Sequence, residues 1–438
     1  VLLLDTQRDA WAAMSDANLD TRPTLDDLIY VIYTSGSTGL PKGAAVYHRG
    51  EINLLHWYVN ALSLSDADRF LLVSAIGFDL TQKNLFAPLT VGGRVVVPDM
   101  EQYDVDVVAN TLHQEGITVV NCAPSAFYPV AEKTSHAGYP FPSLRFAVLG
   151  GEPIRYNGLQ AWLGHPQCQC QLVNSYGPTE CSDVVAAYTL ANELSPPWEV
   201  IPLGRPVANT HLQVLSERGA VLPAGLVGEL YIAGQGVGAG YLNRDELNAQ
   251  SFVQRAEGEG LWYRTGDLVR RWPTGELEYI GRRDFQIKLR GLRIELGEIE
   301  TALRQQVGVI DSLTLVVDDR LVAYIVADGQ FDERHCRQAL RAHLPEYMIP
   351  AVLVPLQCWP LTPNGKVDRK ALPAPDAHAK AEFIAPRNDT EERIAAIWRD
   401  VLGVEKIGVY DDFFDLGGHS LLAARAVSKF RAEFQVEI

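Results

Sequence analysis

Residues 33–43 of the chain read YTSGSTGLPKG, and this stretch decides how the rest of the sequence is interpreted. It follows an apolar run, residues 28–32, that is typical of a buried strand. Its glycines let backbone N–H groups approach an anion, its hydroxyl groups donate further hydrogen bonds, and Lys42 adds positive charge. The stretch therefore predicts a loop that wraps a polyphosphate. It is not a Walker A loop, because Pro41 precedes the lysine and Gly43 follows it.

The alternative is a solvated linker, which is the more common role of a stretch rich in Gly, Ser and Thr. The strand-like run before the loop and the Pro-Lys-Gly ending after it favour phosphate binding over the linker.

Length and charge limit what kind of protein this is. A chain of 438 residues exceeds what one hydrophobic core usually supports, so two or three domains are expected. The apolar fraction of 47% and the charged fraction of 21% are ordinary for globular proteins. A formal charge of -16 disfavours nucleic acid and membrane partners, so a nucleotide site must be locally basic or assisted by a metal ion.

Cysteine spacing and hydropathy indicate an intracellular setting. Six cysteines are scattered along the chain, and only Cys168 and Cys170 lie close together. No set of Cys and His has zinc spacing, so reduced thiols and a cytoplasmic location are expected. No apolar run is long enough to cross a bilayer. The chain begins with Val1 rather than Met, which indicates a piece of a longer polypeptide.

Strand-like runs alternate with stretches long enough for helices over the first two thirds of the chain. Residues 93–97, 117–120 and 146–149 are such runs, and they predict a mixed α/β core with buried sheets. A smaller α/β unit is expected from about residue 285, with strands at residues 313–317 and 321–327.

The last part of the chain predicts a linker and a helical module. Residues 372–381 have linker composition. Asp389 and Glu392 have capping-box spacing, which predicts a helix at the start of a module that begins near Pro386. Its apolar face comprises Ile394, Ile397, Trp398, Val401 and Leu402.

The phosphate loop resembles that of the AMP-forming adenylating enzymes, the superfamily of acyl-CoA synthetases, luciferases and adenylation domains of nonribosomal peptide synthetases. Four more signatures of this superfamily follow in the expected order. Residues 174–180 (NSYGPTE) resemble its adenine and metal segment, and residues 263–267 (YRTGD) resemble its ribose-binding turn. Residues 281–295 resemble its hinge, and residues 364–369 (NGKVDR) resemble the loop with its catalytic lysine.

Each signature also has an ordinary explanation. A buried Tyr beside a turn, an Asx cap, a charged hairpin and an Asn-Gly turn with a surface lysine are all common features. Their ordered coincidence over most of the chain favours the superfamily.

Two features resemble one family within it, the adenylation domains of peptide synthetases. Residues 415–422 (DLGGHSLL) resemble the attachment site of peptidyl carrier domains, in which Ser420 would receive phosphopantetheine. A plain helix N-cap is the alternative for that serine. Asp79 matches the residue that binds the α-ammonium group of an amino acid substrate, although it could instead cap a helix beginning after Leu80.

The resemblance implies four segments: an adenylation core of mixed sheets flanked by helices (1–284), a small mobile α+β subdomain (285–372), a linker (373–385) and a partial helical carrier domain (386–438). Both the start of the core and the end of the carrier are expected to be missing. ATP, Mg²⁺ and covalent 4'-phosphopantetheine are the implied cofactors. The implied partners are an amino acid, a phosphopantetheinyl transferase and neighbouring condensation or other synthetase domains.

The resemblance also assigns roles to residues. Lys366, Thr34 and Lys42 are the implied catalytic residues, Glu180 the Mg²⁺ ligand and Asp284 the hinge. Lys366 would act where the substrate carboxylate meets the α-phosphate, and the small subdomain would swing about the hinge before acyl transfer. The nucleotide-binding positions are Ser35, Gly36, Thr38, Gly39, Gly151, Glu152, Asn174, Tyr176, Gly177, Thr179, Asp267, Tyr279 and Arg282.

The implied substrate pocket is unusually polar, which favours a polar side chain, acidic or amide, such as Glu, Gln, Asp or Asn. If Lys83 and Asp183 pair with each other, a small or neutral side chain also becomes possible. The pocket positions are Asp79, Leu80, Lys83, Asn121, Val148, Gly150, Ser175, Asp183 and Val184, together with Lys366.

Two other functions are compatible with parts of this pattern. A stand-alone acyl-CoA or aryl-CoA synthetase would share the nucleotide signatures but has no use for Asp79 or a tethered Ser420. A catalytically silent scaffold module would not need Lys42, Glu180, Asp267 and Lys366.

Overall fold

The protein is described from a computed structural model that covers residues 12, 14–15, 17, 20–34, 41–100, 103–137, 141–190, 198–255, 260–283, 286–289, 292–317, 320–360, 367–375, 384–404, 406–413, 416, 418 and 420–436. Its first half is built around a seven-stranded sheet with the order β4-β3-β5-β6-β7-β8-β9. Neighbouring strands from β4 to β7 are parallel, and β8 and β9 are antiparallel. The strands are β3 (Arg69–Leu71), β4 (Arg94–Val96), β5 (Val119–Cys122), β6 (Phe146–Gly150), β7 (Gln171–Tyr176), β8 (Ala186–Leu190) and β9 (Arg205–Pro206).

The helices of this half supply apolar faces to the sheet. One buried core lies between β5, β6, β7 and the helices α4, α5 and α6, and a second involves α2 and α3. The side chain of Asp104 caps α4 by accepting hydrogen bonds from the N–H groups of Asp106 and Val107. The helices are α2 (His48–Ala61), α3 (Asp79–Thr90), α4 (Val105–Gln114), α5 (Pro124–Ala137) and α6 (Gln160–Leu163).

Two antiparallel sheets complete the large unit. A three-stranded sheet has the order β1-β2-β12, and a five-stranded sheet has the order β10-β11-β14-β13, with β15 paired to β14. The helix α7 (Asp245–Ser251) packs beside the second of these sheets. The strands are β1 (Leu28–Thr34), β2 (Lys42–Tyr47), β10 (Thr210–Leu215), β11 (Val227–Gly234), β12 (Gly240–Tyr241), β13 (Phe252–Gln254), β14 (Leu261–Arg271) and β15 (Leu277–Arg282).

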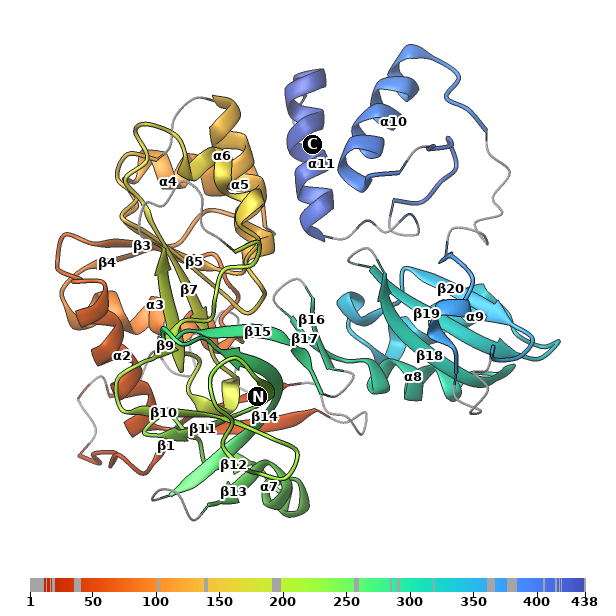
Figure 1. Ribbon diagram of the computed structural model, residues 1–438. Coiled ribbons are helices and arrows are strands. Elements are labelled where there is room, and N and C mark those ends of the chain that lie inside the picture. The colour runs from red at the N-terminus through yellow and green to blue at the C-terminus, as the bar shows by residue number, and fades with distance from the viewer. Residues whose placement is uncertain are drawn as a thin grey trace.

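A smaller unit with its own core follows (Figure 1). The hairpin of β16 (Gln286–Leu289) and β17 (Leu292–Glu295) leads into α8 (Leu296–Arg304). Its sheet has the order β18-β19-β20, and α9 (Glu333–His343) packs against α8. The strands are β18 (Val309–Val317), β19 (Arg320–Ala327) and β20 (Val352–Leu356).

The C-terminal helices α10 (Asp389–Leu402) and α11 (Ser420–Phe434) pack against each other around Val401, Phe413 and Ala426. The cap of α10 differs from the sequence prediction by one residue: Asn388, not Asp389, accepts a hydrogen bond from the N–H group of Glu391. Ile394, predicted on the apolar face, is exposed. The helix still buries an apolar face against α11, because Ile397, Trp398 and Leu402 join that core.

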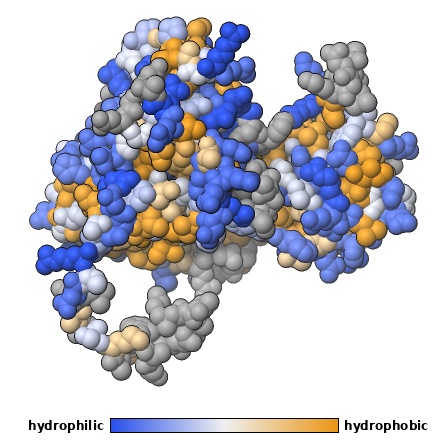
Figure 2. All heavy atoms as spheres, turned by 90° about the horizontal axis from the view of Figure 1, so that it is seen from below, coloured by the Kyte–Doolittle hydropathy of each residue, from blue (hydrophilic) through white to orange (hydrophobic). Residues whose placement is uncertain are grey.

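These elements confirm the predicted mixed α/β class. The predicted runs at 93–97, 117–120 and 146–149 contain β4, part of β5 and most of β6, and the two runs of the smaller unit lie in β18 and β19. None of the described helices combines the length and apolar character that a membrane crossing needs. On the face seen in Figure 2, hydrophilic residues are spread between smaller groups of hydrophobic ones.

Candidate active site

The predicted phosphate loop connects the antiparallel strands β1 and β2. Thr34 ends β1 and pairs in register with Lys42, which begins β2. The Thr34 hydroxyl is buried and has no hydrogen-bond partner among the described residues. Ser35, Gly36, Thr38 and Gly39 lie outside the described residues. The strand pairing thus places both ends of the loop at the same end of strands β1 and β2, where the Lys42 side chain reaches Glu180.

Lys42, Glu180 and Tyr241 form a buried charged cluster. The Lys42 Nζ lies 3.8 Å from Glu180 Oε1 and 4.6 Å from the centre of the Tyr241 ring. The Tyr241 hydroxyl donates a hydrogen bond to Glu180 Oε1 and lies 3.3 Å from the Tyr263 hydroxyl. The predicted lysine and the predicted metal ligand therefore share one site. Tyr241 was missed from the sequence, since Gly240 and Tyr241 form no recognisable motif.

The side chains around Glu180 fit Mg²⁺ better than a metal ion whose ligands all come from the protein. Mg²⁺ is usually held by one or two carboxylates, with substrate phosphates and water completing its coordination. In the part of the chain that the structure describes, no group of three or more His, Cys, Asp or Glu is arranged to hold a metal ion. A single buried carboxylate beside a lysine is the arrangement that a metal-nucleotide substrate requires.

The predicted adenine and ribose motifs meet at Asp267. The Tyr176 hydroxyl donates to Asp267 Oδ2, and Arg282 Nη1 lies 2.8 Å from Asp267 Oδ1. The carboxylate is buried, and it lies on β14 rather than capping a turn. Burial, and then the charge of Asp267, raise the pKa of Tyr176 well above its ordinary value. Strand pairing between β14 and β15 places Asp267 opposite Arg282, and Tyr279 lies three residues earlier on β15.

We expect the variant Arg282→Ala to lower the free energy of unfolding by about 3 kcal/mol, because it leaves Asp267 as a buried carboxylate without a cation. The change is measured from the denaturant midpoint of the intact protein. The matched control is Arg205→Ala, whose ion pair with Glu276 involves a mostly exposed arginine side chain and should contribute about 1 kcal/mol or less. Equal effects for the two variants would contradict this interpretation of the Asp267 site.

Other predicted nucleotide residues lie around this site. The Asn174 amide donates to the backbone oxygens of Ile201 and Pro202 at 3.1 and 2.8 Å. A Cβ on Gly177 would lie 1.9 Å from the backbone oxygen of Asp183, so only glycine fits there. Thr179 begins the short 3-10 helix that carries Glu180. Gly151 adopts a positive φ of 86°, and Glu152 accepts hydrogen bonds from the N–H group and hydroxyl of Ser125.

Strand pairing brings several predicted pocket residues together. Gly150 on β6 pairs with Ser175 on β7, and a Cβ on Gly150 would lie 2.6 Å from Ser175 Oγ and 3.6 Å from Leu80. Val148 lies two residues before Gly150 on the same strand, and Val184 packs in a small cluster with Leu54. The ends of β6 and β7 and the start of α3 therefore bring the predicted pocket positions Gly150, Ser175 and Leu80 close together.

Lys83 and Asp183 form a buried ion pair. This confirms the alternative that the two charges compensate each other, so Lys83 is not available to bind an acidic side chain.

Asp183 and its neighbour Ser182 adopt positive φ angles of 66° and 57°, which strain a non-glycine backbone. Two consecutive residues with positive φ at the predicted pocket indicate that the local backbone is constrained so as to position their side chains.

Asp79 is the first residue of α3, two residues before the helix start considered from the sequence, and Phe78 rather than Asp79 occupies the N-cap position. The Asp79 side chain accepts a hydrogen bond from the N–H group of Leu80 at 2.8 Å and is half-buried. Negative charge at a helix N-terminus is stabilising, and one bond to the backbone leaves the carboxylate able to accept others. Asn121 is buried, and its amide donates to the Leu80 oxygen and to Asn84.

Two predicted residues, Lys366 and Asp284, lie outside the described residues. Ser420 is the first residue of α11, at the head of the helix as the carrier resemblance implies, whereas an N-cap would lie one residue earlier; its side chain is not described.

The C-terminal helix α11 contacts the large unit. It lies against α4 and α5 (Figure 1). Ala424 packs against the hydrophobic core that these two helices form with β5, β6 and β7. Arg425 pairs with Glu132 at 2.9 Å, and Arg431 pairs with Asp104 at 2.6 Å. The helix that begins at Ser420 is therefore held on the unit that contains Lys42 and Glu180.

If Ser420 carries the phosphopantetheine arm that the sequence resemblance implies, we expect Arg425→Glu to slow acyl transfer to that arm about fivefold, because it places like charges opposite Glu132 at this contact. The rate is measured by single-turnover loading of the holo protein. The charge swap Arg425→Glu with Glu132→Arg should restore the rate, which separates docking from an effect on the fold. A swap no faster than the single variant would contradict the docking interpretation.

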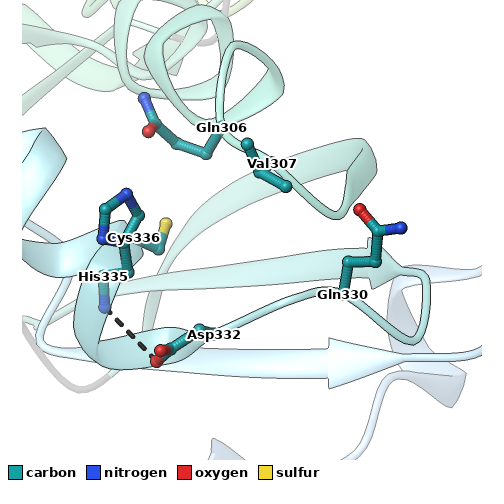
Figure 3. Close-up of a pocket in the computed structure, with 6 residues that line it drawn as sticks. All are labelled: Gln306, Val307, Gln330, Asp332, His335 and Cys336. Carbon is teal, nitrogen blue, oxygen red and sulfur yellow. Dashed lines mark hydrogen bonds between the residues drawn. The ribbon is translucent and has the colours of Figure 1, made fainter.

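A separate pocket of about 230 Å³ lies in the smaller unit (Figure 3). The N–H group of His335 donates to Asp332 Oδ1 at its edge, and burial raises the pKa of the Cys336 thiol to about 11. Its lining contains no residue predicted for the active site. The lining residues are Gln306, Val307, Gln330, Asp332, His335 and Cys336.

Comparison with known proteins identifies two family matches. Residues 2–242 match the family described as AMP-binding enzyme, and residues 392–438 match the family described as phosphopantetheine attachment site. The chain is 40% identical to tyrocidine synthase 3 of Brevibacillus parabrevis and 39% identical to bacitracin synthase 1 of Bacillus licheniformis, in both cases over 100% of its own length. It spans only 7% and 8% of the lengths of these two relatives.

Comparison with solved structures also finds nonribosomal peptide synthetase proteins. Holo-PA1221, a nonribosomal peptide synthetase protein with adenylation and carrier domains, matches 95% of this chain with a TM-score of 0.79 at 29% identity, over 70% of its own chain. Holo-AB3403, a four-domain nonribosomal peptide synthetase, matches 94% of this chain with a TM-score of 0.54 at 34% identity, over 31% of its own.

Proposed function

Because the chain belongs to the AMP-binding enzyme family and also carries a phosphopantetheine attachment region, we propose that it activates an amino acid as its adenylate and transfers it to its own carrier segment. The observation that carries the proposal is the presence on one chain of both matches, with Asp79 at the edge of the predicted pocket. This combination supports a module of a nonribosomal peptide synthetase over a stand-alone acyl-CoA synthetase.

The first half-reaction converts a carboxylate, a poor acyl donor, into a mixed anhydride with AMP. A carboxylate oxygen of the amino acid attacks the α-phosphorus of ATP, the bond to the β-phosphate oxygen breaks, and pyrophosphate leaves. The main obstacle is repulsion between negative charges, so cations must surround the reacting groups. Lys42 supplies one at the β1–β2 edge, Lys366 is proposed to supply another, and Mg²⁺ bound at Glu180 would neutralise phosphate charge.

The remaining residues bind and orient. The Tyr176, Asp267 and Arg282 cluster is proposed to hold the ribose, with Asp267 accepting hydrogen bonds from the sugar hydroxyls. Asp79 is proposed to hold the α-ammonium group, since a buried ammonium needs a carboxylate partner. No general base is required in this half-reaction, because the substrate carboxylate is already ionised.

In the second half-reaction, Ser420 would hold a pantetheine arm whose thiol, on losing its proton, would accept the aminoacyl group from the adenylate and release AMP. The packing of α11 on α4 and α5 supports a carrier that docks on its own adenylation unit. A phosphopantetheinyl transferase and neighbouring synthetase domains are the proposed partners. The six free cysteines support a reducing, cytoplasmic setting.

The proposal is tested by offering the intact holo protein, with ATP and its amino acid, two acceptors: its own carrier and free coenzyme A. We expect the aminoacyl group on the protein and none on coenzyme A. Efficient formation of an acyl-CoA would support the stand-alone synthetase instead, and formation of neither product nor adenylate would support a scaffold module.

A further inference from the structure

A fourth charged side chain, Glu51, lies beside the predicted pocket. Glu51 belongs to the first turn of α2 and is fully buried, and neither carboxylate oxygen has a partner at hydrogen-bond geometry among the described residues. A Cβ on the preceding Gly50 would lie 2.2 Å from Ser182 Oγ, so the start of α2 is packed against the strained segment that carries Asp183. Buried carboxylates without partners are unusual, and each such group needs an explanation.

The neighbouring phenol of Tyr30 interacts with Glu51 and supplies only part of that explanation. Tyr30 on β1 is near enough to Glu51 for each group to influence the pKa of the other. Its hydroxyl nevertheless also lacks a partner at hydrogen-bond geometry among the described residues. A neutral hydroxyl in any case leaves the negative charge of a buried carboxylate uncompensated.

The charges around Glu51 are those of the pocket itself. Burial, and then the charge of Asp183, raise the pKa of Glu51 to about 7, with Lys83 acting against them and Asp79 adding a smaller upward effect. Lys83 already pairs with Asp183, so it does not neutralise a second carboxylate. Glu51 follows Gly50, which is packed against Ser182, so it lies beside the Ser182–Asp183 segment. Asp183 pairs with Lys83, one turn of α3 after Asp79, so this segment lies on the side of the predicted pocket away from the start of α3.

A second unpaired acceptor lies in the same pocket. The Asn121 Nδ2 donates to the Leu80 oxygen at 3.2 Å and to Asn84 Oδ1 at 2.9 Å, which fixes the orientation of the amide. The Asn121 Oδ1 is buried and has no hydrogen-bond partner among the described residues. Glu51, when ionised, and the Asn121 oxygen are both acceptors, and a substrate side chain that complements these two groups must donate hydrogen bonds.

We propose that Glu51 is a specificity-determining residue that binds a basic group at the end of the substrate side chain, so that the activated amino acid belongs to the lysine and ornithine class. This inference rests on the proposed function. A side-chain ammonium donates three hydrogen bonds and neutralises the carboxylate that Lys83 leaves uncompensated. A long side chain fits this arrangement, because Glu51 lies beside the Asp183 segment and Asp79 lies at the start of α3.

Other substrate classes fit less well. An acidic side chain would add a carboxylate beside Glu51 and Asp183, and like charges repel. An apolar side chain would leave Glu51 and the Asn121 oxygen buried and unpaired, which lowers affinity for such a substrate. An amide side chain donates hydrogen bonds but leaves the charge of Glu51 uncompensated, so this inference replaces the acidic or amide preference that the pocket sequence favoured.

The test is pyrophosphate exchange by the intact protein across a panel of lysine, ornithine, glutamine, glutamate and norleucine. We expect kcat/KM for lysine or ornithine to exceed the values for glutamate and norleucine by about tenfold or more. In Glu51→Gln, which keeps size and shape, this preference should fall about tenfold, because the amide oxygen still accepts a hydrogen bond but carries no charge to pair with the ammonium group. The matched control is Glu300→Gln, a partly buried carboxyl on α8.

The pH dependence of the unmodified protein gives a readout that requires no variant. Binding of a basic side chain needs ionised Glu51, so KM for lysine or ornithine should rise as pH falls from about 8 to about 6, by at most about tenfold per pH unit. The groups that face Glu51 are Tyr30 on β1, Asp79 and Lys83 on α3, and Asp183. In Glu51→Gln the dependence should disappear.

The outcomes separate this inference from the proposed function. Exchange with no amino acid would overturn both. Exchange that prefers glutamate or norleucine would support the proposed function and overturn the role of Glu51. Equal loss of activity for every amino acid in Glu51→Gln, or a KM independent of pH in the unmodified protein, would also overturn it, because either result indicates a purely structural carboxyl.

Discussion

The variant Asp79→Ala is expected to lose about 10²- to 10³-fold in kcat/KM for amino-acid-dependent pyrophosphate exchange. The loss follows from leaving a substrate ammonium without its carboxylate in a buried pocket, a change that costs about 3–5 kcal/mol. Asp79 sits at the first turn of α3, with one hydrogen bond to the N–H group of Leu80, so little of its role is structural. The measurement is steady-state exchange with the parent protein and its preferred amino acid.

The control for this prediction is Asp99→Ala, which removes an exposed carboxylate and should leave exchange unchanged. The KM for ATP should also stay within about twofold in Asp79→Ala, since the Lys42 and Asp267 sites do not involve this residue. Full exchange activity in Asp79→Ala would contradict the assignment of the α-ammonium site.

The variant Ser420→Ala is expected to abolish loading of the carrier while pyrophosphate exchange continues. The two half-reactions use different groups, and only the second needs the arm that Ser420 would carry. The measurement is labelled amino acid bound to the protein after incubation with ATP and a phosphopantetheinyl transferase. Mass spectrometry should show no added phosphopantetheine in the variant.

The matched control is Ser428→Ala, which removes a hydroxyl from the same helix α11 but not from its first turn. This control should load normally. Loading of Ser420→Ala at the unmodified rate would show that the arm is attached elsewhere, and loss of loading in both variants would indicate damage to the helix.

Much of the fold could be predicted because the deciding signals are local. The apolar run before the phosphate loop became β1, and the runs at 117–120 and 146–149 gave neighbouring parallel strands of the large sheet. The phosphate loop itself was recognisable from its glycines and lysine alone. Helix caps were less certain, since Asn388 and Asp389 are both good N-caps and only packing against α11 selects between them.

The site could be predicted only where its residues stand in motifs. Glu180, Asp267 and Lys42 are flanked by recognisable neighbours, and the structure brings Lys42 to Glu180. Tyr241 and Glu51 carry no such signal, because their importance comes from β12 pairing with β2 and from α2 packing against Ser182. The Lys83 and Asp183 pair joins residues 100 positions apart, and the sequence left both the paired and unpaired states open.

The central claim is that this pocket binds a carboxylate substrate through its α-ammonium group. The most direct measurement compares pyrophosphate exchange by the intact parent protein for its preferred amino acid and for the same molecule without the α-amino group. The account predicts exchange with the amino acid and a loss of about 10²-fold or more in kcat/KM with the desamino compound. Equal exchange with both compounds would contradict it.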